Sequence, residues 1–313
     1  MKLLDFFYKI NYRLARNDSI WEKLQIRRAS RVSIRFFSNL ILPRLLRKSK
    51  ETLCGCDDSK MVVSLTSFPR RINYVWLVIE TMLCQTYKPS AIVLWLSKVQ
   101  FPNEMEDLPQ SLLNQTKRGL QIRFVEGDVR SHKKYFYAFH EFRDKYVVTI
   151  DDDLFFPTYF LDSMIKCKEK YKDDVIASYG SHFEWNKTEG HLVLQDKCAE
   201  PNISMNDVTF GTGGGTLFEP SKFIDVMDDL ETIVELCPTE DDMYLNALMK
   251  AKGLNVTFHM NGPLLNIRIT NNYTLMQYNG TVGDLSSNNT KQVNNIVNHM
   301  TKKFGFNPFE CNK

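Results

Sequence analysis

Tyr-Val-Val-Thr-Ile-Asp-Asp-Asp, residues 146–153, is the segment from which the architecture of this chain is best predicted. Its first five residues are β-branched, aromatic or apolar, which is the composition of a short buried strand. Such a fully apolar strand is typical of a parallel sheet whose two faces are both covered by helices. Three carboxylates then follow at the point where the strand would end.

The same pattern recurs on the N-terminal side of this segment. Apolar runs that predict strands alternate with helix-like segments, and the strands lie at 61–66, 91–96 and 120–125, with helices at 74–85 and 134–142. We therefore predict an α/β fold with a mostly parallel sheet flanked by helices. Ligands of such open sheets bind beyond the carboxyl ends of the strands, so we expect the site in the loops 67–71, 126–134 and 151–153.

The acidic triplet is the first candidate for chemistry. Three adjacent carboxylates repel one another, and their burial is costly unless a cation or solvent offsets the charge. As alternate residues, Asp151 and Asp153 could face one hard cation, since Mg²⁺ or Mn²⁺ takes one or two carboxylates and leaves positions for diphosphate oxygens. The alternative is a solvated acidic turn that caps a helix beginning near Pro157.

A second acidic segment, Thr-Glu-Asp-Asp-Met-Tyr-Leu at 239–245, precedes an apolar helix that continues to Lys252 and Gly253. Thr239 followed by Asp242 resembles a helix N-cap, which is a structural interpretation. A carboxylate at a helix start could also act as the general base that takes a proton from an acceptor hydroxyl. Both interpretations stay open on the sequence alone.

Between the acidic segments lies Phe-Gly-Thr-Gly-Gly-Gly-Thr, residues 210–216. Glycines such as Gly213 and Gly214 permit close backbone approach, which suits a loop that lies against a sugar or a phosphate. A flexible turn is the alternative. The segment is neither a Walker loop nor a GxGxxG dinucleotide motif.

Basic residues occur in two of the predicted loops: Arg70 and Arg71 in the first, and Lys133 and Lys134 where the loop 126–134 meets the predicted helix. Cations at this sheet edge could hold a diphosphate. Each of them taken singly is more often a solvated surface residue.

Taken in order, five segments resemble the glycosyltransferases of the GT-A fold, and most closely family 2-like bacterial enzymes that build surface polysaccharides. The segments are Val-Ser-Leu-Thr-Ser-Phe-Pro-Arg-Arg (63–71), Met-Leu-Cys-Gln-Thr-Tyr-Lys-Pro (82–89), His-Lys-Lys (132–134), Thr-Ile-Asp-Asp-Asp (149–153) and Thr-Glu-Asp-Asp-Met-Tyr-Leu (239–245). The resemblance covers about residues 60–255 and implies a Rossmann-like GT-A domain.

The resemblance also implies roles for individual residues. A Mn²⁺ or Mg²⁺ ion would be bound by Asp151 and Asp153, and Asp242 would be the catalytic base of an inverting transfer, with Asp241 as the second choice. The resemblance places the nucleotide-sugar donor, expected to be UDP-linked, at the first loop and the Asp triplet. Together with the lysines and glycines considered above, the expected donor-binding residues are Thr66, Ser67, Arg70, Arg71, Lys133, Lys134, Asp152, Gly213 and Gly214.

The function expected is therefore transfer of a sugar to a glycan or lipid-linked acceptor in polysaccharide biosynthesis, such as that of a capsule. Two other classes of protein could use the same residues. A glycoside hydrolase would employ two of the carboxylates as acid and base or nucleophile. A non-catalytic scaffold of a membrane-bound polysaccharide assembly complex would need none of them for turnover.

The first fifty residues differ in composition from the rest. They contain 13 Lys and Arg against 3 Asp and Glu, a balance of +10, while the whole chain carries only +3, so the remainder carries −7. Large apolar residues recur among the basic ones at spacings of three and four, which predicts basic amphipathic helices. Residues 1–50 could therefore contact an anionic membrane surface. The alternative is a helical extension packed on the main domain.

Nucleic acid is not an expected partner, because the remainder is acidic.

We divide the chain into an extension and linker (1–59), a transferase domain (60–270) and a C-terminal loop with a closing helix (271–313). The seven scattered cysteines predict free thiols. No stretch approaches the roughly 18 consecutive apolar residues of a membrane span, and no secretory signal is evident. We therefore expect a cytoplasmic protein, peripheral on the inner face of the cell membrane.

Overall fold

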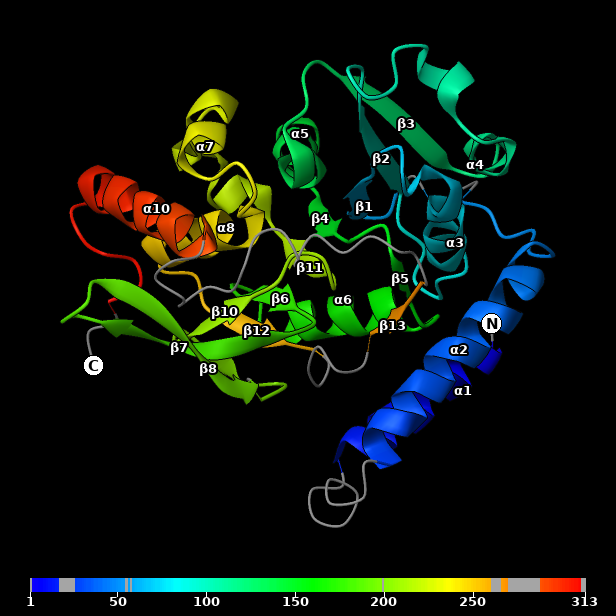
Figure 1. Ribbon diagram of the computed structural model, residues 1–313, viewed down its shortest axis with the longest axis horizontal. Helices are drawn as coiled ribbons and strands as arrows, with labels where there is room; N and C mark the ends of the chain where they lie inside the picture. Colours follow the sequence, from blue (N-terminus) through cyan, green and yellow to red (C-terminus); the bar gives the residue numbers. More distant parts are fainter. Residues whose placement is uncertain are drawn as a thin grey trace.

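A central sheet organises the fold in the computed structural model, which describes residues 2–16, 26–53, 56, 58–198, 200–259, 266–269 and 288–310. Within these residues the sheet has eight strands (Figure 1). Their spatial order is β3 (Leu120–Val125), β2 (Ala91–Ser97), β1 (Met61–Thr66), β4 (Tyr146–Thr149), β11 (Thr216–Phe218), β6 (Val175–Ala177), β12 (Val256–Phe258) and β9 (Ser204–Met205).

The strands of this sheet run mostly in one direction. β1 lies parallel to β2 and β4, and β2 lies parallel to β3. β11 is antiparallel to both of its neighbours, β4 and β6, whereas β6 and β12 are parallel and β9 is antiparallel to β12. The predicted α/β fold with a mostly parallel sheet is confirmed. The inserted antiparallel strand β11 is a feature that the pattern of apolar runs does not predict.

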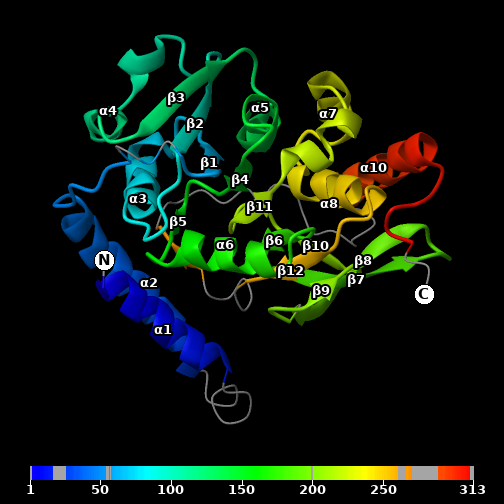
Figure 2. The same ribbon diagram turned by 180° about the vertical axis from the view of Figure 1, so that it is seen from behind.

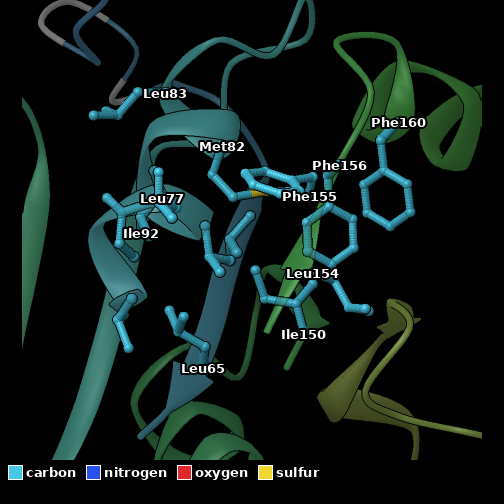
Figure 3. Packing of buried hydrophobic residues seen from close by; sticks show 14 of the residues in the cluster. Leu65, Leu77, Met82, Leu83, Ile92, Ile150, Leu154, Phe155, Phe156 and Phe160 are labelled. Atoms are coloured by element: carbon cyan, nitrogen blue, oxygen red, sulfur yellow. The ribbon is translucent and has the colours of Figure 1, made fainter. Parts of the chain in front are cut away.

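Alternate residues of each strand face opposite sides of the sheet, and each side is covered by its own helices. On one side, Val63 of β1 and Leu94 of β2 belong to an apolar cluster that includes residues of α3 (Ile72–Leu83), α4 (Gln110–Thr116) and α6 (Phe160–Lys170). Figure 3 shows part of it, with Met82 of α3 close to Phe155 and Phe156. Phe155 lies in β5 (Leu154–Phe155), which pairs with β13 (Ile267–Arg268).

The other side of the sheet is covered by α5 (Lys133–Glu141), α8 (Asp241–Ala251) and α10 (Asn288–Phe304). Val62 of β1 and Val147 of β4 pack with these helices in a second apolar cluster. α7 (Leu230–Leu236) contacts α10, and the three-stranded sheet of β10 (Val208–Phe210), β7 (Gly180–Asn186) and β8 (His191–Cys198) contacts α8 and α10. Short 3-10 helices lie at Glu104–Asp107, Arg130–His132, Pro220–Lys222 and Ile224–Val226.

The N-terminal segment forms two helices, α1 (Lys2–Arg16) and α2 (Ile26–Leu46), which lie side by side along one flank of the molecule (Figures 1 and 2). Their inner faces bury Leu4, Tyr8, Leu42 and Leu46 in the same apolar cluster as α3. The Tyr8 hydroxyl donates a hydrogen bond to the carbonyl of Phe155. Packing on the main domain, one of the two interpretations of this segment, is therefore correct for the inner faces.

Local boundaries follow the predictions to within two residues for α3 and α5. The predicted N-cap at Thr239 is wrong, because α8 begins at Asp241 and has Glu240 as its N-cap, without a side-chain capping bond. The Thr239 amide instead donates a hydrogen bond to Gln292 Oε1 of α10 at a distance of 2.9 Å. The predicted helix near Pro157 begins later, at Phe160, after β5.

The remaining predictions concern the ends of the chain and its cysteines. Cys56, Cys84, Cys167 and Cys237 are free thiols, as predicted. The predicted closing helix corresponds to α10, whereas the loop expected before it, at 271–287, lies outside the described residues. Among the helices that the structure describes, none has the length and apolarity to cross a membrane.

Candidate active site

The carboxyl ends of β1 and β4 lie at the same level of the sheet, because Ser64 pairs with Thr149 in their register. The residues that follow the two strands therefore meet. The Ser67 hydroxyl donates to one oxygen of Asp152 at 2.5 Å, and Arg71 Nη1 donates to the other at 2.6 Å. All three side chains are buried. Asp152 thus connects the first loop to the end of β4, and its carboxylate is already occupied by these two donors.

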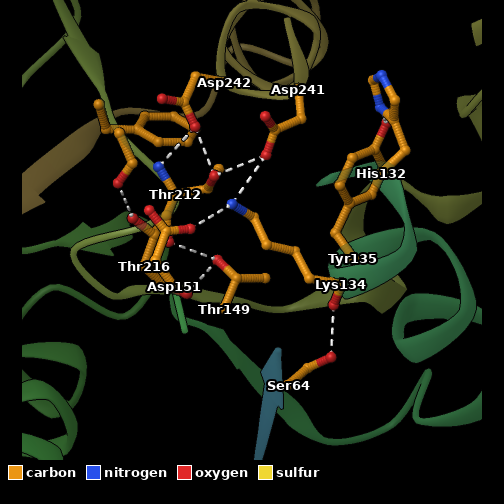
Figure 4. Close-up of polar contacts among 12 residues, drawn as sticks. Ser64, His132, Lys134, Tyr135, Thr149, Asp151, Thr212, Thr216, Asp241 and Asp242 are labelled. Carbon is orange, nitrogen blue, oxygen red and sulfur yellow. Dashed lines mark hydrogen bonds and ion pairs between the residues drawn. The ribbon is translucent and has the colours of Figure 1, made fainter. Parts of the chain in front are cut away.

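Lys134 connects the two acidic motifs (Figure 4). Its ammonium lies 3.0 Å from Asp151 Oδ1, at the end of β4, and 3.0 Å from Asp241 Oδ2, at the start of α8. The Lys134 side chain is 4% exposed, and its pair with Asp241, which is 11% exposed, lies in a region of low dielectric. Burial opposes the charged form, but the charges of Asp151, Asp241 and Asp242 outweigh it and raise the pKa of Lys134 well above its ordinary value.

Thr212 of the glycine-rich segment holds the start of α8. Its backbone amide donates to Asp242 Oδ1 at 2.8 Å. Its hydroxyl lies 2.5 Å from the same oxygen and 3.0 Å from Asp241 Oδ2, so one proton is shared between two acceptors. Both carboxylates lie in the first turn of α8, where the helix dipole favours negative charge.

The two adjacent carboxylates differ in proton affinity. Burial, together with the negative charge of Asp241, raises the pKa of Asp242 to about 6. Burial would also raise the pKa of Asp241, but the positive charges of Lys134 and His132 outweigh it and lower that pKa. Burial with the charges of Asp242 and Asp241 raises the pKa of Glu240 to about 8. Among these three, Asp242 therefore combines ionisation at neutral pH with the higher basicity.

The glycine-rich segment is packed closely against these residues. A Cβ atom at Gly213 would lie 1.9 Å from Asp151 Oδ2, and the Gly213 carbonyl accepts a hydrogen bond from the Asp151 amide at 2.8 Å. A Cβ atom at Gly214 would lie 2.2 Å from the Tyr179 ring. At both positions the backbone therefore lies close to a neighbouring side chain, where glycine leaves room that a Cβ atom would fill.

Two further carboxylates, Asp151 and Asp153, follow the end of β4, and they differ in exposure. The Asp151 side chain is 45% exposed and that of Asp153 is 11% exposed. Burial, with the negative charge of Asp151, raises the pKa of Asp153 to about 6. Arg71 Nη2 lies 3.4 Å from Asp153 and offsets part of this charge. A hard cation would relieve the remaining repulsion, and two carboxylates leave positions for phosphate and water oxygens. Across the described ranges, no group of three or more His, Cys, Asp and Glu side chains is placed to hold a metal ion.

The other predicted donor-binding residues are distributed around this group. The Thr66 hydroxyl donates to the Trp95 carbonyl at 2.8 Å, and Arg70 is exposed. Lys133 does not join Lys134 at the acidic residues. Its side chain is nearly fully buried and its ammonium is paired with Asp128.

Two residues of this site are absent from the sequence predictions, Thr212 and Tyr179. Tyr179 follows β6 and packs against the glycine-rich segment, and its pKa is raised by burial and by the charges of Asp242 and Asp151. A strand-end rule applied to the short apolar run Val175–Ala177 would have identified Tyr179. Thr212 could be identified only from its contacts, since a threonine between glycines carries no distinctive signal.

No family model and no curated protein matches the sequence. Among solved structures, the chain is similar to 4-diphosphocytidyl-2C-methyl-D-erythritol synthase from Anaerococcus prevotii, with 13% identity and a TM-score of 0.41 over 68% of this chain and 94% of that one. It is also similar to residues 1–349 of TarS from S. aureus, solved alone and in complex with UDP, with 12% identity and a TM-score of 0.42 over 63% of this chain. The match spans 57% of that TarS chain. At these identities and scores, neither similarity assigns the chain to a family.

Proposed function

We propose that this chain is a sugar transferase, which takes a sugar from a nucleotide-diphosphate donor and passes it to a hydroxyl of a glycan or lipid-linked acceptor. The observation that carries the proposal is the contact of both acidic motifs with one buried cation, Lys134. Through Lys134, Asp151 of the proposed metal-binding pair is linked to Asp241, the neighbour of the proposed base Asp242. The resemblance of these motifs to GT-A-fold transferases agrees with this reaction.

Asp242 is the better candidate for the base. Its raised pKa, about 6, leaves it ionised at neutral pH and more basic than an ordinary aspartate. Asp241 is the weaker candidate, because its carboxylate is engaged by Lys134, which helps to lower its pKa. Removal of a proton from the acceptor hydroxyl by Asp242, with direct displacement at the anomeric carbon, gives an inverted product.

Asp151 and Asp153 would hold Mn²⁺ or Mg²⁺, which when bound would neutralise the charge that develops on the leaving diphosphate. The chain's own residues fix this geometry. Lys134 holds Asp151 through an ion pair, and Gly213 holds its backbone through a hydrogen bond. Arg71 and Ser67 hold Asp152, which fixes the backbone between the two metal-binding candidates. A UDP-linked donor and a role in surface-polysaccharide synthesis remain part of the proposal.

The test is a screen of nucleotide-sugars for Mn²⁺-dependent binding and for turnover, measured as nucleoside diphosphate release. Asp151→Asn with Asp153→Asn should abolish Mn²⁺-dependent binding. Asp242→Asn should retain binding and lose turnover by about 10²- to 10⁴-fold, the range for removal of a general base. Asp162→Asn is the matched control, because Asp162 pairs with Lys166 on α6, outside this group.

Three outcomes would contradict the proposal. The metal assignment would be excluded if nucleotide-sugars bind without any divalent ion and still bind to the variant that lacks both Asp151 and Asp153. Full turnover in Asp242→Asn would exclude the base. Release of sugar from a glycan without any nucleotide donor would instead identify a hydrolase.

A further inference from the structure

Helix α2 carries large apolar side chains on two faces, and within the described part of the chain only one of these faces is covered. The inner face, turned toward the main domain, buries Ile34, Ser38, Leu42 and Leu46, which recur at every fourth residue. The other face carries large apolar side chains that remain accessible, which we call the outer stripe: Val32 (64% exposed), Phe36 (63%), Phe37 (49%) and Leu40 (46%). Scattered exposed apolar residues are ordinary on protein surfaces, but a contiguous stripe with two phenylalanines marks an interaction surface.

The exposed charged side chains of α2 beside the outer stripe are basic. Arg35 and Arg44 are exposed on α2, and Arg44 Nη1 donates to the Leu40 carbonyl at 2.6 Å, so its side chain lies along the helix next to the stripe. The sequences of α1 and α2 contain one acidic residue, Asp5. Its carboxylate accepts hydrogen bonds from the amide and hydroxyl of Thr158, both at 2.8 Å, so it faces the main domain.

We infer that the outer stripe of α2 docks this protein on an anionic lipid surface. An amphipathic helix lies in the interface plane with its apolar side chains among the headgroups, while arginines at its border pair with lipid phosphates. Phe36, Phe37 and Leu40 supply the apolar contact, and Arg35 and Arg44 supply the charge. The inner face keeps the helix attached to the main domain, so the whole molecule would be carried to the surface. The inference is independent of the proposed transferase activity.

The full-length chain is tested for co-sedimentation with phosphatidylcholine vesicles that contain or lack phosphatidylglycerol. We expect binding to the anionic vesicles that weakens as salt is added, because salt screens the arginines. The variant Phe36→Ser/Phe37→Ser/Leu40→Ser should bind at least about tenfold more weakly. The matched control is Val99→Ser/Met105→Ser, which removes exposed apolar residues elsewhere on the surface and should bind like the wild type.

A second variant, Arg35→Gln/Arg44→Gln, separates charge from apolar contact and should remove most of the preference for anionic vesicles. Thermal unfolding should be unchanged in both variants, since the altered side chains are exposed. The inference is overturned if the wild type does not co-sediment with anionic vesicles, or if it co-sediments with neutral vesicles to the same extent. It is also overturned if the protein is a dimer without lipid and the stripe variant is a monomer, because a second copy would then cover the stripe.

Discussion

The position of Lys134 in the sequence is compatible with two roles, binding of a phosphate and pairing with carboxylates. A lysine at the ligand edge of an α/β sheet is expected to face a phosphate, yet the Lys134 ammonium lies between Asp151 and Asp241. Removal of one partner of a buried ion pair leaves an uncompensated charge, which is far more costly than loss of a surface pair. Lys134 therefore stabilises the arrangement of both acidic motifs, and it sets the proton affinity of the residues around it.

This arrangement predicts the pH dependence of the reaction. The base must be ionised, so the wild-type kcat/KM should fall as pH drops below about 6, the raised pKa of Asp242. The charge of Lys134 lowers that pKa, so Lys134→Gln should move the acid limb to higher pH. A pH–rate profile of both proteins measures the shift.

The control for this prediction is Lys98→Gln. The Lys98 side chain is 41% exposed and pairs with Glu126 on the surface. A surface ion pair of this kind contributes little to stability. Its acid limb should coincide with that of the wild type. An acid limb that stays in place in Lys134→Gln would argue against Asp242 as the base, or against electrostatic control by Lys134.

At the scale of elements, the glycine-rich segment before β11 joins the end of β4 to the start of α8. The Gly213 carbonyl bonds the Asp151 amide, and Thr212 bonds both carboxylates of α8. β11 itself pairs with β4 antiparallel, with Thr216 opposite Thr149, which brings the segment alongside the acidic triplet. The close packing of this segment therefore holds the end of β4 and the start of α8 in place.

Gly213→Ala should disrupt this packing. The new Cβ would lie 1.9 Å from Asp151 Oδ2, so the carboxylate or the segment must move. We expect Mn²⁺-dependent nucleotide binding to weaken by about tenfold or more, because a site ligand displaced by even 1 Å loses much of its effect. Isothermal titration calorimetry of the two proteins measures this loss.

Gly190→Ala is the comparison. Gly190 lies in the turn between β7 and β8 at φ +65, with no atom within 4 Å of an added Cβ. That variant pays only the strain of a left-handed backbone, about 1–2 kcal/mol, and its nucleotide binding should be unchanged. Equal binding by the wild type and Gly213→Ala would show that close packing at Gly213 is dispensable for the site.

At the scale of the whole molecule, the N-terminal helices are part of the main core. Leu4, Tyr8, Leu42 and Leu46 share one apolar cluster with β1, β2 and α3. Burial of each of the three leucine side chains contributes about 1.5–3 kcal/mol. Helices α1 and α2 are therefore packed into the main core, although the composition of the N-terminal segment differs from that of the remainder.

Deletion of residues 1–50 should lower the midpoint of thermal unfolding and promote aggregation, because it uncovers the apolar surface under α1 and α2. Differential scanning calorimetry and light scattering measure these effects. The outer-stripe variant of α2 should retain the wild-type midpoint, since it leaves the inner face intact. A truncated protein with the wild-type midpoint would contradict a shared core.

The sequence by itself determined the parallel half of the sheet, the helices α3 and α5 and the loops that carry the acidic motifs, whereas α4 was not predicted. These features follow from local periodicity and from the rule that parallel strands end at one edge. Only the tertiary structure decided that Asp152 is occupied by Ser67 and Arg71, and that Lys134 but not Lys133 joins the acidic residues. The same holds for Thr239, which bonds Gln292 rather than capping α8. The partner of a polar side chain depends on strand register and on contacts between distant segments, and neither is encoded in the spacing of residues along one segment.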